Sequence, residues 1–278
     1  MTERPDPRAR PARALALSIA GSDSGGGAGI QADLKTFHSF GVVGTTAITA
    51  ITAQNTLGVT AVHPVPVEIV RAQIDAVVDD LRPAAIKSGM LATAQMVETV
   101  ARAVRDHRLK PYVMDPVMVA TSGDRLLDAD AQEALVRELL PLAQLVTPNL
   151  HEATMLTGIE VASAADLRAA ARALVQLGAS AALVKGGHLP GDEAIDLFWD
   201  GRDEHLWRRP RLPERDTHGT GCTLSAAVTA NLANGVRLID AVSRAIGYVA
   251  RAIASAPGLG RGHGPIDHFA PVDPSPDI

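Results

Sequence analysis

Short apolar runs alternate with longer amphipathic segments along most of the chain. Each apolar run ends at a glycine or a polar residue, as a buried strand does before a loop. The intervening segments repeat apolar residues every three or four positions, which predicts helices. The expected strands are Ala14 to Ala20, Ala84 to Lys87, Tyr112 to Met114, Leu145 to Val146 and Ala181 to Lys185. The expected helices are Ile30 to Phe40, Ile69 to Leu81, Thr93 to Arg108, Ala129 to Leu140 and Ala164 to Leu177. This alternation predicts an α/β protein with a parallel sheet.

Three regions depart from the simple alternation. The segment Thr45 to Ala53 is rich in Thr, Ala and Ile and predicts one strand, which a β-rich piece from Val59 to Val65 follows. Two more polar strands, Ala194 to Trp199 and His205 to Arg209, predict an antiparallel edge of the sheet. A final long helix, Leu238 to Ala254, is expected to cover the sheet.

Composition limits the classes of protein to consider. The 278 residues are 46% hydrophobic and 21% charged, which is typical of one soluble domain, expected at residues 14–270. The Pro-rich ends, 1–13 and 271–278, are expected to be disordered. A net charge of -5 without a basic stripe argues against nucleic-acid binding, and the chain has no apolar run of membrane-spanning length. A single cysteine fits a reducing compartment, so we expect a cytoplasmic protein.

The most informative stretch runs from Asp216 to Ala227, where a glycine-rich turn leads into a helix of small residues. Gly219 and Gly221 flank Thr220 and let backbone amides converge at the positive end of the helix, an arrangement that binds anions. Cys222 lies in the first turn, where the helix dipole favours a thiolate. A lone cysteine can also be a small core residue, but the glycine turn before it favours an anion site with a base beside it.

A second glycine-rich loop, Gly21 to Asp33, separates the first strand from the first helix. Within it, Gly27-x-Gly29-x-x-Ala32 matches the dinucleotide-binding fingerprint in form. The acidic residue that should follow about 20 positions later is missing, which argues against a dinucleotide oxidoreductase. Cys222 and the nearby His218 raise the alternative of a thiol hydrolase, although closeness in sequence does not establish contact. The nine histidines show no metal-binding spacing.

Polar residues gather where the expected strands end. Asp115, Asn149 and Glu152 follow two successive strands, and the carboxyl ends of parallel strands are where open α/β sheets bind ligands. Lys185 ends another strand directly before two glycines, a position suited to a phosphate. Gln54 follows the Thr/Ala/Ile strand, where its carboxamide can offer a donor and an acceptor to a heterocycle. Each residue also has a plainer interpretation, as a helix cap, a strand exit or a turn residue.

Taken together, the motifs resemble the ribokinase-like superfamily and, within it, the hydroxymethylpyrimidine/phosphomethylpyrimidine kinases of thiamine biosynthesis. The resemblance covers Ala14 to Phe269. The motifs that carry it are Gly21 to Asp33, Thr52 to Thr56, Lys87 to Leu91, Asp115 to Met118, Thr147 to Glu152, Val184 to His188 and Thr217 to Leu224. It implies a three-layer α/β/α sandwich with a mostly parallel central sheet.

The resemblance also implies roles for individual residues. The positions matching the pyrimidine pocket are Gly21, Ala28, Asp33, Gln54, Met90 and Val117, with Gln54 contacting the nitrogen edge of the ring. The positions matching the ATP site are Lys185, Thr217, Asp115 and Asn149, and those matching the Mg²⁺ site are Glu152 and Asp115. Gly219, Thr220 and Gly221 match the catalytic anion hole, and Cys222 stands where most sugar kinases of the superfamily have an aspartate base.

The implied reaction is ATP-dependent phosphorylation of 4-amino-5-hydroxymethyl-2-methylpyrimidine, and then of its monophosphate to the diphosphate. Cys222 is expected to accept the proton of the hydroxymethyl oxygen in the first step and to matter less in the second, where the nucleophile is already ionised. A pyridoxal or pyridoxine kinase on the same scaffold is the nearest alternative, and a nucleotide-binding protein without turnover is another. We also expect a homodimer.

Overall fold

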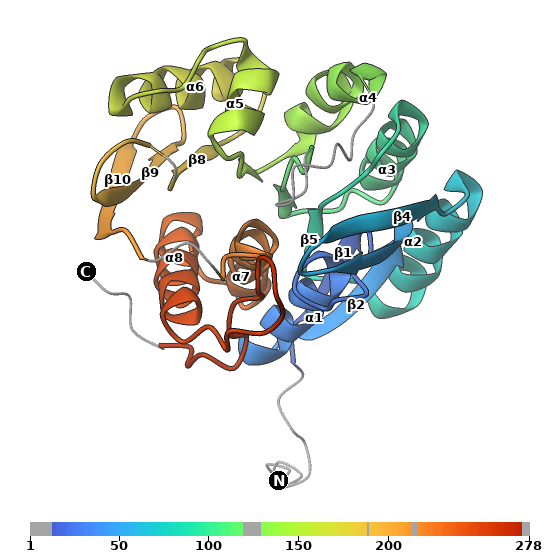
Figure 1. Cartoon of the computed structure of the whole chain (residues 1–278). Coiled ribbons are helices and arrows are strands. Elements are labelled where there is room, and N and C mark those ends of the chain that lie inside the picture. Colours follow the sequence, from blue (N-terminus) through green and yellow to red (C-terminus); the bar gives the residue numbers. More distant parts are fainter. Residues whose placement is uncertain (1–12, 119–128, 188, 213–215, 274–278) are drawn as a thin grey trace, which may run out of the picture.

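The computed structural model describes residues 13–118, 129–187, 189–212 and 216–273. Its central sheet has the strand order β10-β9-β8-β7-β6-β5-β1-β2 (Figure 1). The strand bounds are β1 Leu15–Ala20, β2 Val43–Ile48, β5 Ala85–Ser88, β6 Tyr112–Met114, β7 Leu145–Val146, β8 Ala182–Gly186, β9 Glu193–Trp199 and β10 Glu204–Pro210. Except for residues 13 and 271–273, the predicted disordered tails lie outside the described residues, and the domain limits 14–270 stay a prediction.

The sheet is mostly parallel. The strands from β2 through β1 and β5 to β8 pair in parallel, whereas β9 pairs antiparallel with β8 and β10 antiparallel with β9. The predicted antiparallel edge is therefore confirmed. After β1 the chain adds β2 on one side and later adds β5 on the other, so the strand order reverses at β1. Ligands of open α/β sheets bind beyond the carboxyl ends of the strands at such a reversal.

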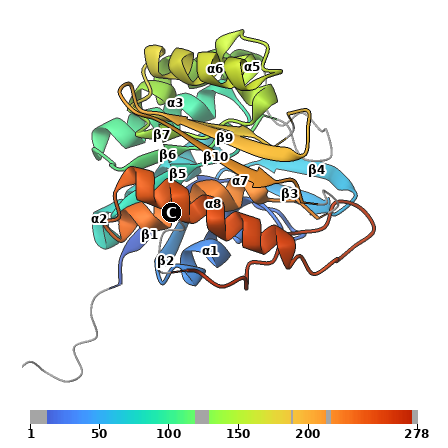
Figure 2. The ribbon, with the colours of Figure 1, turned by 90° about the vertical axis from the view of Figure 1, so that its left-hand side faces the viewer.

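Helices cover both faces of the sheet, which confirms the three-layer sandwich (Figures 1 and 2). One layer contains α2 Val67–Leu81, α3 Ala94–Asp106, α4 Ala129–Ala134, α5 Leu150–Thr157 and α6 Ala164–Gln176. The other contains α1 Gly29–Ser39, α7 Thr220–Ala233 and α8 Leu238–Ala254. Side chains of a strand alternate between the two layers, so Tyr112 and Met114 of β6 pack in one core and Val113 in the other. Among the described residues, no helix is long and apolar enough to cross a membrane.

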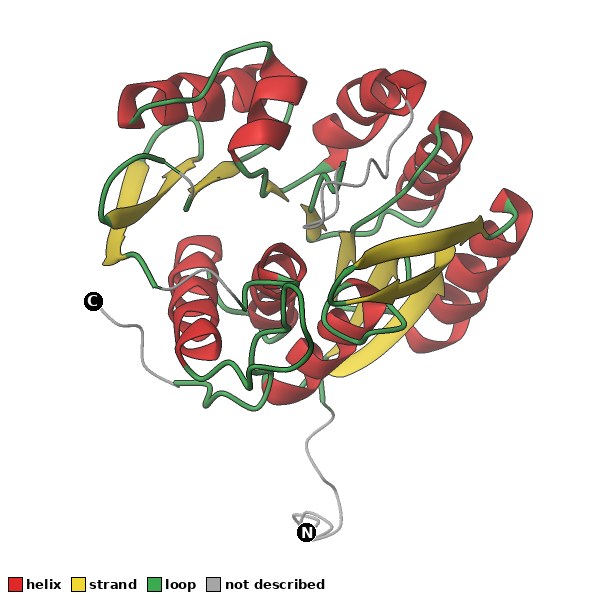
Figure 3. Cartoon of the chain, in the orientation of Figure 1, coloured by secondary structure: helices red, strands yellow, loops and turns green. Residues whose placement is uncertain are grey.

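A two-stranded hairpin stands apart from the main sheet (Figure 3). It consists of β3 Ala50–Asn55 and β4 Gly58–Pro64 in antiparallel register. The expectation of one strand from Thr45 to Ala53 is therefore wrong, because the chain leaves the sheet after β2. Thr49 fixes the backbone at the point where the chain leaves the sheet. Its amide donates to the carbonyl of Ala20 at 3.0 Å and its hydroxyl to the carbonyl of Met90 at 2.7 Å. The hairpin strand begins at Ala50, the next residue.

Two helical regions also differ from the sequence-based expectation. Helix α5 had no predicted counterpart, although its amino end is a capping box in which Asn149 and Glu152 each bond the other's backbone amide. The single helix expected over Ala129 to Leu140 is instead α4, a π-helical turn at Leu135–Leu139 and a 3₁₀ turn at Leu140–Leu142. Both turns bring apolar side chains to the core that α4 alone would not reach.

Candidate active site

A cavity of about 670 Å³ opens at the carboxyl ends of the parallel strands. The residues that follow β1, β5, β6 and β7, together with the end of β8, border it, as the reversal of strand order leads one to expect. The hairpin, the turn before α7, one face of α8, and residues of β9, β10 and the chain after β10 also line it. Of the predicted site residues, the structure brings together Gly21, Ala28, Gln54, Met90, Asp115, Val117, Asn149, Glu152, Lys185, Thr217, Gly219, Thr220, Gly221 and Cys222.

Asp33 is the predicted pocket residue that does not line the cavity. Its carboxylate is fully buried on α1 and pairs with the ammonium of Lys87, also fully buried, at 2.7 Å. The Ser18 hydroxyl donates to the second carboxylate oxygen at 2.5 Å. Burial alone would lower the pKa of Lys87, but neighbouring negative charges, Asp33 foremost, outweigh it and raise the pKa. In this structure Asp33 therefore compensates a buried cation and does not line the cavity, and nothing in its sequence spacing distinguishes that role from ligand contact.

The glycine-rich turn forms as the sequence predicts. Gly219 is the residue before α7 and has φ of 84°, a left-handed conformation that favours glycine. A Cβ atom at Gly219 would overlap the carbonyl of Gly27, so the two glycine-rich loops pack backbone against backbone. The Thr220 amide donates to the carbonyl of Thr217 at 3.2 Å. The role of Gly219, Thr220 and Gly221 as an anion hole stays a prediction.

One lysine and two carboxylates face the start of α7. The Nζ atom of Lys185 lies 3.5 Å from Oδ1 of Asp115 and 4.0 Å from Oε2 of Glu152. The same Nζ would lie 3.1 Å from a Cβ atom placed on Gly221, which puts the cation beside the helix end. The hydroxyls of Thr147 and Ser225 donate to the two oxygens of Asp115. Lys185 supplies one positive charge against two negative ones, so a second cation or a proton is needed to neutralise both carboxylates.

The pKa shifts reflect this imbalance of charge. Burial raises the pKa of Glu152 to about 7, and the Asp115 carboxylate adds to the rise while the Lys185 ammonium opposes it. Burial alone would lower the pKa of Lys185, but the carboxylates of Asp115 and Glu152 outweigh it and raise the pKa. A carboxyl group with a pKa near neutrality beside a second carboxylate is a typical feature of a functional site.

Cys222 is not the ready thiolate that its helix position predicts. The side chain is partly exposed, and the amide of Gly29, the first residue of α1, bonds its sulfur. Burial nevertheless raises the pKa of Cys222 to about 12, and Lys87 opposes this rise while Asp115 adds to it. The free protein therefore holds a thiol at neutral pH. The amino ends of α1 and α7 both favour a thiolate at this sulfur. Burial and the neighbouring carboxylates raise the pKa by more than these helix ends lower it.

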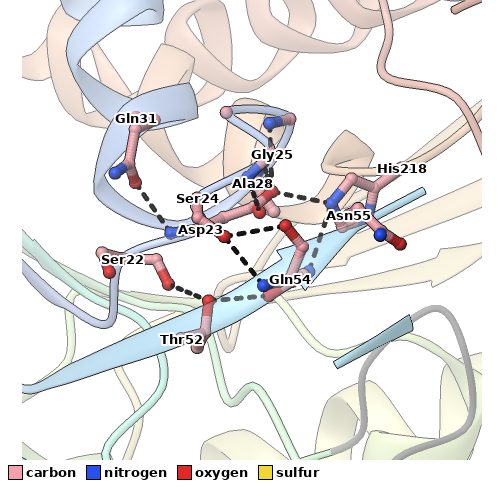
Figure 4. A network of polar contacts seen from close by, with 12 residues as sticks. Ser22, Asp23, Ser24, Gly25, Ala28, Gln31, Thr52, Gln54, Asn55 and His218 are labelled. Atoms are coloured by element: carbon pink, nitrogen blue, oxygen red, sulfur yellow. Dashed lines mark hydrogen bonds and ion pairs between the residues drawn. The ribbon is translucent and has the colours of Figure 1, made fainter. Parts of the chain in front are cut away.

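A polar network that the sequence did not reveal joins the three loops around the cavity (Figure 4). The buried carboxylate of Asp23 accepts from the backbone amides of Gly25, Gly27 and Ala28 at 2.8, 3.0 and 2.8 Å. Its Oδ2 also lies 2.9 Å from Nε2 of His218, which in turn is 3.4 Å from Nε2 of Gln54. Asp23 followed by Gly25 is the local signal of such a turn, because a short carboxylate readily caps amides two residues ahead.

The far end of the cavity is apolar and was not predicted. Residues of α8 and of the chain after β10 form it. Its apolar members are Leu212, Ile246, Val249, Ala250 and Ile253. Beside them, the buried carboxylate of Asp196 pairs with the guanidinium of Arg209. A flat apolar group can bind at this end while a charged group reaches Lys185 and the turn before α7.

A cavity that brings Lys185 and the amino end of α7 together with an apolar end and several polar side chains is the arrangement expected of a phosphotransferase site, and the fold is ribokinase-like. The family model described as phosphomethylpyrimidine kinase matches residues 23–267. The chain belongs to this family.

Individual relatives support the same conclusion. The hydroxymethylpyrimidine/phosphomethylpyrimidine kinase of Rhizobium meliloti (strain 1021) is 57% identical over 92% of this chain and 97% of its own length. The pyridoxal kinase of Bacillus subtilis in its ADP complex has a TM-score of 0.87 and 39% identity, over 93% of this chain and 98% of that one. A phosphomethylpyrimidine kinase from Clostridium difficile 630 has a TM-score of 0.78 and 41% identity, over 87% and 100% of the two chains.

Proposed function

We propose that this protein transfers the γ-phosphoryl group of ATP to 4-amino-5-hydroxymethyl-2-methylpyrimidine, and then to its monophosphate, giving the diphosphate used in thiamine biosynthesis. The observation that carries the proposal is the arrangement of Lys185 and the turn before α7 in one cavity with Gln54. The 57% identity to a kinase named for both pyrimidine substrates supports this choice of substrate.

In this proposal, catalysis rests on positioning and on charge. The adenine binds at the apolar end of the cavity beside α8, and Thr217 and Asn149 lie beside the phosphates. Lys185 and the backbone amides of Gly221 and Cys222 face the transferring phosphoryl group and stabilise its charge. The pyrimidine lies against Gly21, Ala28, Met90 and Val117, with Gln54 at its nitrogen edge. The hydroxymethyl oxygen then points at the γ-phosphorus.

The two carboxylates suit Mg²⁺. Magnesium binds proteins through one or two carboxylates and completes its shell with water and substrate phosphates. Asp115 and Glu152 provide this pair beside Lys185, and the Asn149 amide donates to Oε2 of Glu152 at 2.8 Å, which orients the carboxylate. No cluster of three or more metal-binding side chains occurs in the described part of the chain. When bound, Mg²⁺ would neutralise phosphate charge.

Product analysis tests the proposed function. Purified protein with magnesium-ATP is offered the hydroxymethylpyrimidine, its monophosphate or pyridoxal, with ADP release measured and products identified by phosphorus NMR. Formation of a pyrimidine diphosphate from either pyrimidine is the expected result. The similarity to pyridoxal kinases keeps pyridoxal as a second candidate substrate. A catalytic efficiency for pyridoxal equal to or above that for the pyrimidine would overturn the assignment.

The expected homodimer is part of this proposal. Large apolar side chains are exposed on the hairpin, on β2 and at the start of α2: Val43, Ile51, Val62 and Ile69 are 42–54% exposed. In the hairpin register Ile51 is opposite His63 and Thr52 is opposite Val62, so Ile51 and Val62 lie on opposite faces. A second copy of the chain is the proposed cover for the face that carries Ile51, because exposed apolar groups favour association. Light scattering should give twice the mass of one chain, and Ile51→Glu should shift the protein toward monomer. A wild-type monomer at assay concentration contradicts the proposal.

The predicted cytoplasmic location stays part of the proposal as well. The one free thiol, Cys222, lies in the proposed active site, and a reducing compartment keeps such a thiol from oxidation.

A further inference from the structure

Asp23 dictates where His218 carries its hydrogen. Burial alone would raise the pKa of Asp23, but bonds from His218 and from backbone amides outweigh burial and lower the pKa, so the group is a carboxylate at neutral pH. A carboxylate only accepts hydrogen bonds. The 2.9 Å contact between Oδ2 of Asp23 and Nε2 of His218 therefore requires a hydrogen on Nε2, and that nitrogen acts as a donor.

The same N–H also faces the side-chain carboxamide of Gln54, so its single hydrogen is shared between Asp23 at 2.9 Å and Gln54 at 3.4 Å (Figure 4). In the structure Nε2 of Gln54 lies 3.4 Å from this ring nitrogen, which carries hydrogen and cannot accept a bond from it. Turning the amide by 180° about its last bond places the oxygen there instead, and we assign it so. The turned amide presents its NH₂ group to the Thr52 hydroxyl, at the position that Oε1 holds in the structure, 3.2 Å from Oγ1. This is consistent, because Thr52 donates its own hydrogen to the Ser22 carbonyl at 2.8 Å and accepts from Gln54.

Two further bonds hold the backbone of Gln54. The Gln54 amide donates to Oγ of Ser24 at 2.7 Å, and Oγ of Ser24 donates to the Gln54 carbonyl at 2.7 Å. His218 is held equally well, because its backbone amide donates to the Gly264 carbonyl at 3.1 Å. The side-chain amide of Gln54 thus projects from a fixed backbone, and its donor and acceptor ends exchange by rotation about its last bond. The N–H of His218 opposes that rotation.

We infer that His218, held by Asp23, is a positioning residue that fixes the donor and acceptor order of the Gln54 carboxamide and thereby selects an aminopyrimidine over a hydroxypyridine. The inference rests on the proposed function. An aminopyrimidine presents a ring nitrogen acceptor beside an amino donor, which complements the N–H and C=O of a carboxamide. A hydroxypyridine has no such amino donor, and its ionised oxygen repels a fixed amide oxygen. An amide that is free to turn can offer its N–H to either substrate.

Paired substitutions at His218 test the inference. His218→Leu removes the donor, whereas His218→Gln keeps an N–H of similar reach. The measured quantity is the ratio of kcat/KM for the hydroxymethylpyrimidine to kcat/KM for pyridoxal. The ratio should fall about tenfold in His218→Leu, the effect of losing one orienting hydrogen bond, and should stay within about threefold of wild type in His218→Gln. An unchanged ratio in His218→Leu overturns the inference.

A matched control separates orientation from general loosening of the loop. Oε1 of Gln31 accepts from the Asp23 amide at 2.8 Å, so Gln31→Met weakens the same loop without removing the His218 donor. This variant should keep the wild-type substrate ratio, whatever its thermal stability. A fall in the ratio equal to that of His218→Leu would show that loop order alone sets selectivity and would overturn the inference.

The substrate preference of the wild-type protein separates failure of the proposed function from failure of the inference. Failure of the proposed function appears in wild type itself, as a preference for pyridoxal, which also overturns the inference. Failure of the inference alone appears as a wild type that prefers the pyrimidine and variants that keep its ratio. Nitrogen NMR of the wild type gives a readout that does not depend on variants folding. A hydrogen on Nε2 of His218 at neutral pH supports the inference, and a neutral ring with hydrogen only on Nδ1 overturns it.

Discussion

Lys185→Met is expected to lower kcat/KM for both phosphorylation steps by about 10³-fold. Lys185 is the partly buried cation beside the turn before α7, and its Nζ lies within 4.0 Å of carboxylate oxygens of Asp115 and Glu152. The substitution removes positive charge from the transferring phosphoryl group. It also leaves two neighbouring carboxylates without their cation, so that bound phosphates meet net negative charge. Steady-state kinetics with both pyrimidine substrates measures the loss.

A matched control makes this result specific. Arg168→Met removes a cation that pairs with Glu204 at the protein surface, where ion pairs contribute little to stability, and should leave kcat/KM unchanged. Thermal unfolding of both variants checks that they are folded at the assay temperature. Activity of Lys185→Met within about threefold of wild type would mean that Lys185 only neutralises the carboxylates and does not act on the phosphoryl group.

Cys222→Ser is expected to lower the first phosphorylation by about 10²-fold and the second by less. In the first step a hydroxymethyl group must lose a proton, whereas in the second the attacking phosphate oxygen is already ionised. The wild-type rate of the first step should also rise with pH between about 7.5 and 9. With a pKa of about 12, Cys222 is almost entirely a thiol in this range, and its thiolate fraction grows tenfold per pH unit.

The pH profile of the variant is the decisive comparison. Serine is a far weaker acid than cysteine, so Cys222→Ser should lose the rise that the thiolate causes while keeping any change due to other groups. Rates of the two steps, measured separately across this range for both proteins, check the prediction. A wild-type profile that is flat, or a rise that the variant shares, would assign Cys222 to orienting the acceptor and not to accepting its proton.

Local sequence patterns predicted much of the fold. The strand β6 was predicted at its observed bounds, and the antiparallel edge formed by β9 and β10 was predicted from its polar strands. Periodicity succeeds there because burial on one or both faces imposes a repeat on the sequence. It fails at Thr49, where the chain leaves the sheet within a continuous Thr/Ala/Ile segment. Strand and hairpin share the same residue preferences, so only contacts with Ala20 and Met90 reveal the exit.

The sequence by itself determined most of the polar groups that line the cavity and that they meet at one edge of a parallel sheet. Motif order also identified the glycine turn at Gly219 and the lysine at Lys185, because a tight turn and a strand end are local features. Only the tertiary structure decided what each group experiences. It buried Asp33 against Lys87, kept Cys222 a thiol and joined Asp23 to His218. Burial and pairing depend on neighbours distant in sequence, and these set charge, protonation and orientation.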